Sequence, residues 1–284
     1  MVENSNPLNK YFRQPALYVS LPSGQSYPPH VIAPSQTGEL AVMPMTAKDE
    51  IRFKTPDALM NGQGVVDVIQ SCCPEIKDAW QIKSYDLDTI LIAIRIATYG
   101  ETMDMSFVVP KANESVQHSV NLPALLEEVK QQQIKSEVVM KDGLKITVRP
   151  LTYKDMTQTS LQTFQQQKMY TAVQESQLSD DEKSAKFNEA FKTLTDINSN
   201  ILLKNISKIT LPDGAEVTDP TQIKEFVEHA NASLIKDIET QIMALRTQGA
   251  VKPLKLKATE DQIKKGAPVT YEVPVTFDNA NFFV

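Results

Sequence analysis

The sequence predicts an α+β fold: a compact N-terminal mixed domain with a small antiparallel sheet, followed by a long-helix C-terminal half that ends in a short strand. Three observations predict it. An apolar helical segment lies at 87–99, apolar and polar residues alternate between 102 and 148, and long Gln- and Lys-rich helical patterns follow residue 152. We therefore expect four segments: an extended arm at 1–15, an N-terminal α+β domain at 16–150, a helical region at 151–250, and an extended or strand-forming tail at 251–284.

The composition is that of a globular protein. The 284 residues are 41% hydrophobic and 23% charged, so the chain can bury a sizeable core. A net charge of -6 argues against a nucleic-acid partner, because neutralising phosphates needs a concentrated basic surface. The longest apolar stretch, 89–98, is too short to span a bilayer, and 1–15 lacks the apolar region of a signal peptide. We therefore expect a soluble protein, made in a cytoplasm, without membrane or nucleic-acid partners.

The first elements are two short β runs, at 16–21 and 40–43. Two helix starts follow them. Thr46 is a predicted N-cap with an acidic residue three positions on, and Thr55 is another, with Pro56 at the first helical position. These signals place short helices directly after the second β run.

A third helix is expected at 63–73, and it ends on the adjacent cysteines Cys72 and Cys73. A disulfide between neighbouring residues would close a strained ring, so we expect small buried side chains at a helix end. A catalytic thiol would need a histidine partner, and the three histidines bear no motif relation to this pair.

The helix at 87–99 is predicted to start at the cap Asp86 and to end before Gly100, a residue that suits a left-handed conformation. Its apolar residues run almost all round the axis. A helix that is apolar on most faces is buried on most faces, so we place it at the centre of the N-terminal domain.

Beyond it the period changes to two. Four strands, with a short helix at 122–132 between the pairs, predict one small antiparallel sheet. Asp142-Gly143 is a strong hairpin signal between the last two strands. The strands are expected at 102–109, 115–120, 136–140 and 144–148.

Two long polar helices are expected at 153–174 and 180–205, joined by a bend, with Ser179 as the cap of the second. They allow two interpretations, which the sequence leaves open. One is a solvated helical bundle, and the other is an interaction surface for a helix of a second protein.

A strand and turn at 206–214 precede one last long helix, 221–248, which Asp219 and Pro220 open. Its apolar residues form a single stripe, so this helix should pack on one side only. Residues 269–277 alternate as a half-buried strand does.

The chain ends on an apolar group after a polar turn. Such an end is unfavourable in water, so it is either folded back into the core or held in another subunit, and the sequence leaves both open. We expect deletion of residues 279–284 to abolish partner binding or stable folding. The predicted partner-binding residues are Phe277, Asn279, Phe282, Phe283 and Val284.

No sequence motif indicates catalysis, a metal or a cofactor. Zinc-ligand spacings, phosphate-binding loops and nucleophile elbows are missing from the sequence. Carboxylate pairs such as Asp86 and Asp88 lie at helix starts, where capping and solvation explain them. We expect a non-enzymatic protein without cofactors, and an enzyme with an unrecognised site is the alternative from a different class.

Three stretches, 17–24, 41–62 and 93–100, resemble the baseplate hub assembly proteins of T-even-like myoviruses. The closing segment 275–283 is similar to the end of longer members. The first hundred residues thus carry most of the resemblance.

The resemblance implies a non-enzymatic bacteriophage protein: a structural component or assembly factor of the baseplate hub of a contractile tail. Its partners would be other tail or hub proteins in a hetero-oligomeric assembly. The alternative is a tail assembly chaperone that binds the tape-measure protein and is absent from the virion. Either way, the protein would occupy the host cytoplasm during assembly, and the virion baseplate if it is retained. A regulatory binding module of the host cell is a third hypothesis.

The chain departs from the family in one respect. Relatives carry Cys-Pro-x-Cys after the strand that follows the third stretch, and again before the terminal strand. Here the corresponding regions, 108–112 and 257–265, have no cysteine. We therefore carry over no metal site and expect packing to hold these loops.

Overall fold

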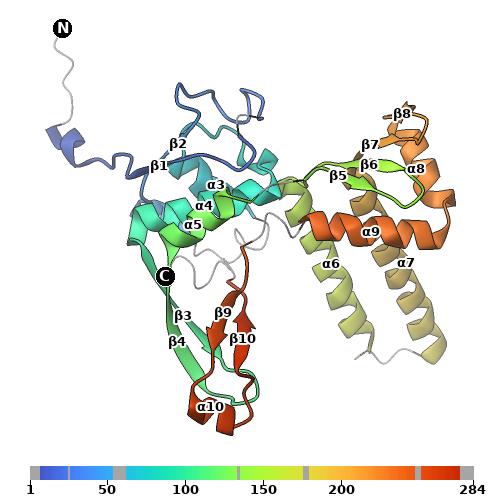
Figure 1. Cartoon of the computed structure of the whole chain (residues 1–284). Helices are drawn as coiled ribbons and strands as arrows, with labels where there is room; N and C mark the ends of the chain where they lie inside the picture. The colour runs from blue at the N-terminus through green and yellow to red at the C-terminus, as the bar shows by residue number, and fades with distance from the viewer. Residues whose placement is uncertain are drawn as a thin grey trace.

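The computed structural model describes residues 7–24, 26–53, 62–132, 135–174, 179–246 and 251–275. Figure 1 shows the predicted α+β class, with helices accompanying small sheets in which all the described strand pairs are antiparallel. Three hydrophobic clusters hold the described residues together. The fold class predicted from the sequence is confirmed.

The first cluster defines what we call the N-terminal body. A two-stranded sheet and several helices surround its central helix, α4. The elements of the N-terminal body are β1 (Leu17–Val19), β2 (Leu40–Val42), α1 (Ala47–Phe53), α3 (Gln63–Cys72), η2 (Ala79–Gln81), α4 (Ser84–Tyr99) and α5 (Leu122–Lys130). A short 3₁₀ turn, η1 (Pro7–Tyr11), precedes them on the arm.

Helix α4 is buried over nine of its residues, as its nearly continuous apolar surface predicted. Gly100 follows its end with a φ of 94°, and its N–H donates to the Ile96 carbonyl at 3.0 Å. The predicted start was wrong: the helix begins at Ser84, so Asp86 lies in its first turn and is not the cap. The carboxylate of Asp86 is fully buried and accepts hydrogen bonds from a preceding loop.

A second two-stranded sheet projects from the N-terminal body and is joined near its far end by the C-terminal strands (Figure 1). We call this unit the β stalk. The third hydrophobic cluster holds it together. Its elements are β3 (Thr102–Val108), β4 (Ser115–Asn121), β9 (Leu254–Lys257), α10 (Glu260–Lys264) and β10 (Thr270–Val273).

The second cluster lies under a four-stranded sheet in the order β5-β6-β7-β8, which packs with two helices. We call this the four-stranded unit. Its elements are β5 (Glu137–Val139), β6 (Lys145–Val148), β7 (Ile206–Thr210), β8 (Glu216–Val217), α8 (Pro220–His229) and α9 (Ala232–Arg246).

The four-stranded unit corrects one prediction. Strands β5 and β6 were expected to join β3 and β4 in a single sheet, but β6 pairs with β7 instead, with Ile146 opposite Ile209. The long hairpin between β6 and β7 brings these distant strands together, and their apolar faces cover the stripe of α8 and α9. Gly143, with a φ of 87°, makes the predicted turn between β5 and β6.

That hairpin consists of α6 (Tyr153–Gln174) and α7 (Asp180–Asn205), two long antiparallel helices that project from the rest of the chain (Figure 1). Ser179 caps α7 as predicted. Its hydroxyl accepts from the Glu182 N–H, and the Glu182 carboxylate accepts from the Ser179 N–H.

The last long helix was predicted as one piece, and this was wrong. Its stripe does pack on one side, but Ala230 is extended and separates α8 from α9. The Asn231 side chain accepts the Ser233 N–H at 2.8 Å and so starts α9. Asp219 caps α8 and Pro220 opens it, as predicted.

Of the early helix signals, the Thr46 hydroxyl accepts the Asp49 N–H at 3.3 Å and caps α1 as predicted. The predicted cap Thr55 lies outside the described residues. The predicted C-terminal strand is present as β10, whereas its antiparallel partner β9 was missed.

Candidate protein-binding surfaces

The predicted partner-binding residues Phe277, Asn279, Phe282, Phe283 and Val284 lie outside the described residues. The last described residue, Val275, is buried in the first cluster, where Val251 and Leu254 also pack. The chain therefore returns to the N-terminal body after forming the four-stranded unit.

The α6–α7 hairpin is fixed at its base. The rings of Tyr153 and Trp80 stack with centroids 5.5 Å apart, which joins α6 to η2. Gly62 packs closely against α6 at the same place. A Cβ at this position would lie only 2.9 Å from Thr157 Cγ2, and the φ of 78° also favours glycine. The Lys204 ammonium lies 3.0 Å from the Asp155 carboxylate and joins the two helices.

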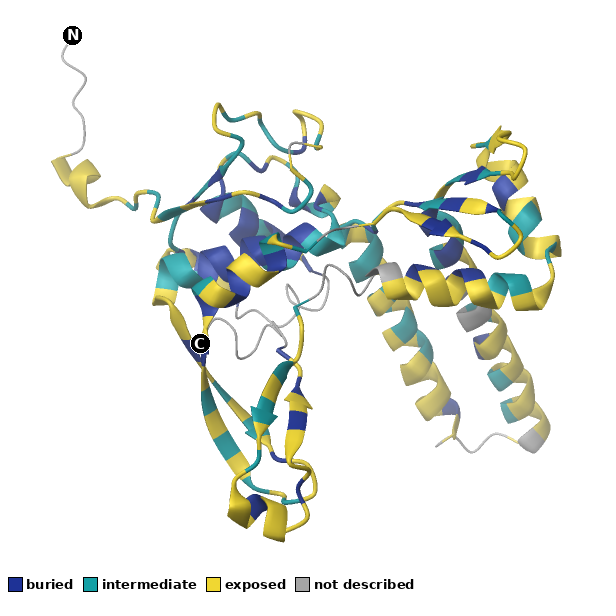
Figure 2. Cartoon of the chain, viewed as in Figure 1, coloured by how far each residue is buried: buried dark blue, intermediate teal, exposed yellow. Residues whose placement is uncertain are grey.

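The other end of the hairpin, residues 164–174 and 180–191, is covered much less. We call it the distal hairpin. Figure 2 shows it mostly exposed. Its buried residues are Val173 and Ala190, among those that the structure describes. Large side chains are nevertheless open to solvent there, with 49% of Tyr170 and 72% of Phe191 exposed. Exposed aromatic side chains that gather in one place indicate an interaction site.

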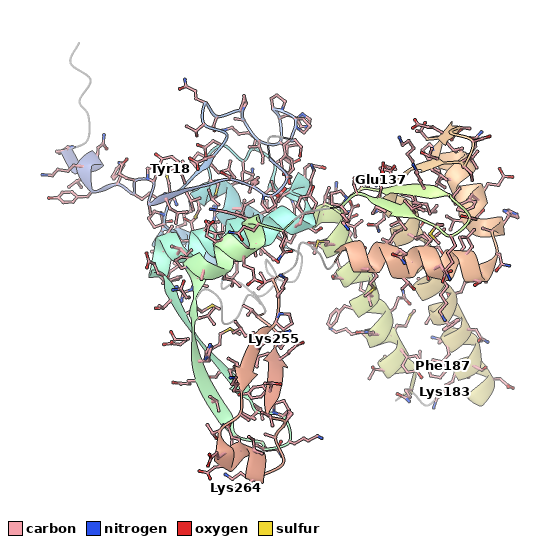
Figure 3. The ribbon with its side chains drawn as sticks, in the orientation of Figure 1. Tyr18, Glu137, Lys183, Phe187, Lys255 and Lys264 are labelled. Carbon is pink, nitrogen blue, oxygen red and sulfur yellow. The ribbon has the colours of Figure 1, made fainter. Side chains whose placement is uncertain are left out.

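A groove of about 590 Å³ runs between the two helices of the distal hairpin. The rings of Tyr170 and Phe187 meet in it with centroids 4.6 Å apart, and Figure 3 labels Phe187 near the distal end of α7. The lining side chains are Gln166, Gln167, Tyr170, Thr171, Phe187, Asn188, Ala190 and Phe191. None of these is an Asp, Glu, Lys, Arg or His, although 23% of the chain is charged.

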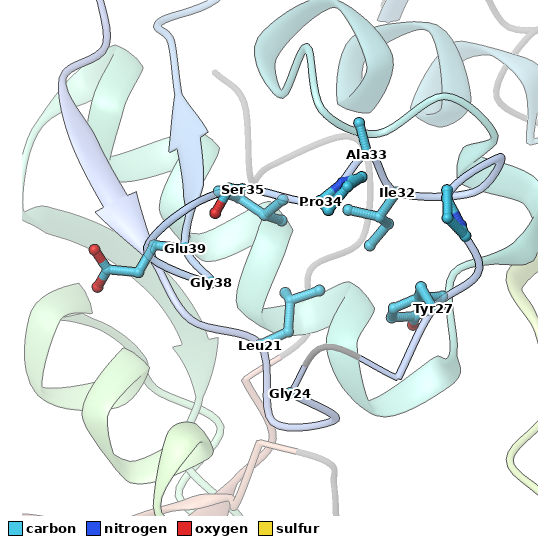
Figure 4. A pocket seen from close by; sticks show the side chains of 11 residues that line it. Leu21, Gly24, Tyr27, Ile32, Ala33, Pro34, Ser35, Gly38 and Glu39 are labelled. Atoms are coloured by element: carbon cyan, nitrogen blue, oxygen red, sulfur yellow. The ribbon is translucent and has the colours of Figure 1, made fainter.

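A smaller pocket of about 80 Å³ lies in the loops between β1 and β2. Figure 4 shows Leu21, Tyr27 and Ile32 around it. Two prolines, Pro29 and Pro34, add to the lining, so the pocket is mainly apolar. Its size suits a single side chain rather than a substrate.

The floor of this loop region is tied to α4 by Asp86. Its carboxylate accepts the Tyr27 hydroxyl at 2.6 Å and the Ser23 N–H at 2.9 Å, while the Lys83 N–H donates to the Tyr27 oxygen at 2.7 Å. Burial raises the pKa of Asp86, and burial together with this carboxylate raises the pKa of Tyr27. Among the described residues, the partners of this network belong to the loop or to the start of α4, so the network positions the loop on the helix.

The N-terminal arm exposes further apolar side chains. Tyr11 and Phe12 are largely open to solvent, and Arg13 follows them at the surface of the N-terminal body. The Arg13 guanidinium donates to the Ser71 carbonyl at 2.7 Å and pairs with Asp49 at 3.2 Å. Arg13 thus fixes the point at which the arm leaves the body.

The β stalk contains the two regions in which relatives carry Cys-Pro-x-Cys and this chain does not. Val109, in the first of the two regions, packs in one cluster with Ala267 and Tyr271, which lie beside the second. Lys265, in the second region, also forms an ion pair with Glu114, which lies two residues after the first. Packing therefore holds these loops together, as expected from the sequence.

The structure also places the remaining chemical groups. Cys72 and Cys73 are free and buried, as predicted, and burial raises the pKa of Cys72 to about 12. In the described part of the chain, no cluster of three or more His, Cys, Asp or Glu side chains could hold a metal ion. His229 contacts the backbone of its own helix, through Nδ1 and the Glu225 carbonyl at 3.0 Å.

Comparison with known proteins decides the family. A family model described as T4 bacteriophage base plate protein matches residues 20–265. The chain belongs to this family. The resemblance to T4-like baseplate proteins is thereby confirmed, and this is a phage baseplate protein. No curated protein and no solved structure matches the chain.

Within the described residues of this baseplate protein, no helix is both long and apolar enough to cross a membrane. The groove residues Tyr170, Phe187 and Phe191 were not predicted from the sequence. One signal pointed to the α6 side of the groove alone: no charged residue occurs between Met156 and Gln167, a run that ends at the lining residues Gln166 and Gln167. An exposed helix usually carries charges on its solvent face.

Proposed function

We propose that this baseplate protein is a non-enzymatic component or assembly factor of the baseplate hub of a contractile tail, and that it acts through contacts with other proteins. The distal hairpin carries the proposal, because it presents an uncharged groove and exposed aromatic side chains outside every hydrophobic cluster of the described chain. Such surfaces are typical of protein interaction sites. Its partners are other baseplate or hub proteins in a hetero-oligomeric assembly.

A second candidate is a tail assembly chaperone that binds the tape-measure protein and leaves before the virion is complete. The same groove supports it, since a chaperone also binds a helix or an extended segment. The two candidates place the protein differently: the virion baseplate for the hub component, and only the host cytoplasm for the chaperone.

An enzyme with an unrecognised site is the less supported candidate. Catalysis by carboxylates needs two of them converging on a cleft. The groove on the distal hairpin has none, and the lining of the smaller pocket has one, Glu39. The buried Asp86 is held by a tyrosine hydroxyl and a backbone N–H of a neighbouring loop, which supports a structural role.

Mass spectrometry of purified phage particles separates the first two candidates. We expect the protein in the virion, in a fixed ratio to the other baseplate proteins, and its absence there would favour the chaperone. Infection with a phage from which the gene is deleted should give particles without a complete baseplate. Complete tails in that infection would contradict both candidates.

A further inference from the structure

The distal hairpin is a two-helix layer. At its base, α6 contacts η2 and α4, while α7 contacts α8 and β7. Figure 1 shows the distal hairpin projecting past these elements. Two helices have no enclosed interior between them, and stable helical units normally gain one from a third layer. Only Val173 and Ala190 are buried among the distal side chains that the structure describes.

The shape of the groove favours a helix as the occupant. Two antiparallel helices form its walls, and the ridge of side chains on a third helix fits between two such walls. The described groove has no strand edge, so it offers no backbone partners to an extended peptide. Tyr170, Phe187 and Phe191 provide aromatic surface on which apolar anchors of a helix can pack.

The uncharged lining of the groove favours the apolar face of the bound helix over its charged face. Every lining side chain is uncharged, so a charged face would lose its hydration without gaining an ion pair. The lining likewise offers no ion-pair partner to a nucleic acid or an acidic peptide. Gln166, Gln167 and Asn188 can hydrogen-bond to uncharged polar groups at the edge of the contact.

We propose that the groove between α6 and α7 binds one amphipathic α-helix of another baseplate protein and forms a three-helix bundle with it. The bound helix packs apolar side chains spaced three and four residues apart against Tyr170, Phe187 and Phe191. The proposal deepens the proposed function and rests on it, because it names the surface and the kind of partner.

The extent of the groove argues against a second copy of this chain. The lining spans residues 166–171 of α6 and 187–191 of α7, which is about one and a half turns of each helix. A stable dimer buries about 800 Å² on each partner and uses about 20–30 residues a side. The eight lining residues fall well short of that and match the anchors of a single helix.

Site-specific crosslinking in the full-length protein tests the proposal. Benzoylphenylalanine is placed at position 191, and the protein is co-expressed with the other baseplate proteins of the same phage. Position 243 on α9 is the matched control, because Met243 is 66% exposed and Phe191 is 72% exposed. We expect a crosslink from position 191, absent from position 243, that maps to one helical segment of another baseplate protein.

A synthetic peptide of that segment then gives the affinity. We expect Phe191→Lys and Tyr170→Lys to weaken peptide binding at least tenfold, and Met243→Lys to change it less than twofold. Circular dichroism and thermal unfolding confirm that each variant is folded. Phe191→Ala, a milder change, serves if a lysine variant fails to fold.

Three outcomes overturn the proposal: a crosslink to a second copy of this chain, equal crosslinking from both positions, or a peptide that binds the Phe191→Lys variant as tightly as the unchanged protein. Failure of the groove proposal can be distinguished from failure of the proposed function. If tails need the protein but position 191 yields no helical segment, the groove proposal falls and the proposed function stands. If the segment belongs to a protein outside the tail, the groove binds a helix but the baseplate role falls.

Discussion

Helices α4 and α6 are both long, and they are used in opposite ways. Nine of the 16 residues of α4 are buried, whereas α6 buries one described residue, Val173, out of 22. Helix α4 is surrounded by the N-terminal body, while α6 shares its distal half with α7 alone. The difference separates a helix that the fold needs from a helix that, in our proposal, is displayed to a partner.

The energies of the two helices follow from this difference. A fully buried isoleucine contributes about 1.5–3 kcal/mol relative to an exposed one, and α4 has several. A side chain exposed on α6 or α7 contributes little to stability in the isolated protein. In our proposal, its contribution arises on binding, when a partner removes it from water.

The largest effect is expected in α4. Ile92 is fully buried, so Ile92→Ala removes apolar contacts and leaves a cavity. We expect a loss of about 2–5 kcal/mol in the free energy of unfolding. Urea denaturation followed by circular dichroism measures it. A loss below 1 kcal/mol would contradict the central place given to α4.

The next largest effect on stability is expected from a charged residue of the same helix, Asp88. Burial raises the pKa of Asp88 from 3.8 to about 6, although the carboxylate accepts the N–H of Val251. The folded state therefore binds more protons than the unfolded state between these values, so Asp88 lowers stability as the pH rises from about 4 to 6.

Asp88→Asn removes this titration. We expect the variant to be about 1–3 kcal/mol more stable than the unchanged protein at pH 7, with the difference shrinking towards pH 4. Chemical denaturation across the pH range measures it. The same difference at pH 4 and pH 7 would show that the charge of Asp88 is not its cause.

A substitution in the α6–α7 hairpin should lower stability less. Ser179→Ala removes the hydroxyl half of the capping box at the start of α7. We expect a loss of about 1 kcal/mol, confined to the distal hairpin because no hydrophobic cluster supports it. Hydrogen exchange should show faster exchange at the start of α7 and unchanged exchange in α4. Equal changes in both helices would mean that the hairpin and the body unfold together.

The smallest effect is expected at the groove. Phe191→Ala should change the free energy of unfolding by less than about 0.5 kcal/mol, because most of the side chain is already exposed to water. The measurement is the same urea denaturation as for Ile92→Ala. A large loss would assign Phe191 to the fold and would blur the difference between the two helices.

Local signals in the sequence predicted much of the fold. The caps at Thr46, Ser179 and Asp219 were predictable because a side chain two or three residues from its partner decides them. The burial of α4 was predictable because its own apolar residues surround the axis. The hairpin turn at Gly143 follows from glycine's tolerance of positive φ.

Distant or competing interactions explain what was missed. Ile146 and Ile209 pair although more than sixty residues separate them in the sequence. No local sequence pattern therefore predicts that β6 pairs with β7. The stripe of α8 and α9 is continuous, so it hid the break at Ala230, where Asn231 can cap a new helix. The groove depends on the packing of α6 on α7, and only the run without charges before Lys168 was visible in the sequence.

The return of the chain to the N-terminal body has a consequence for synthesis on the ribosome. The first cluster draws on residues 19–129 and again on Val275, whereas the second uses residues 138–242. The four-stranded unit and its hairpin are therefore complete while the N-terminal body still awaits its last segment. A newly made chain can display the distal hairpin before the body has closed, so a partner could meet the hairpin while the chain is still being translated.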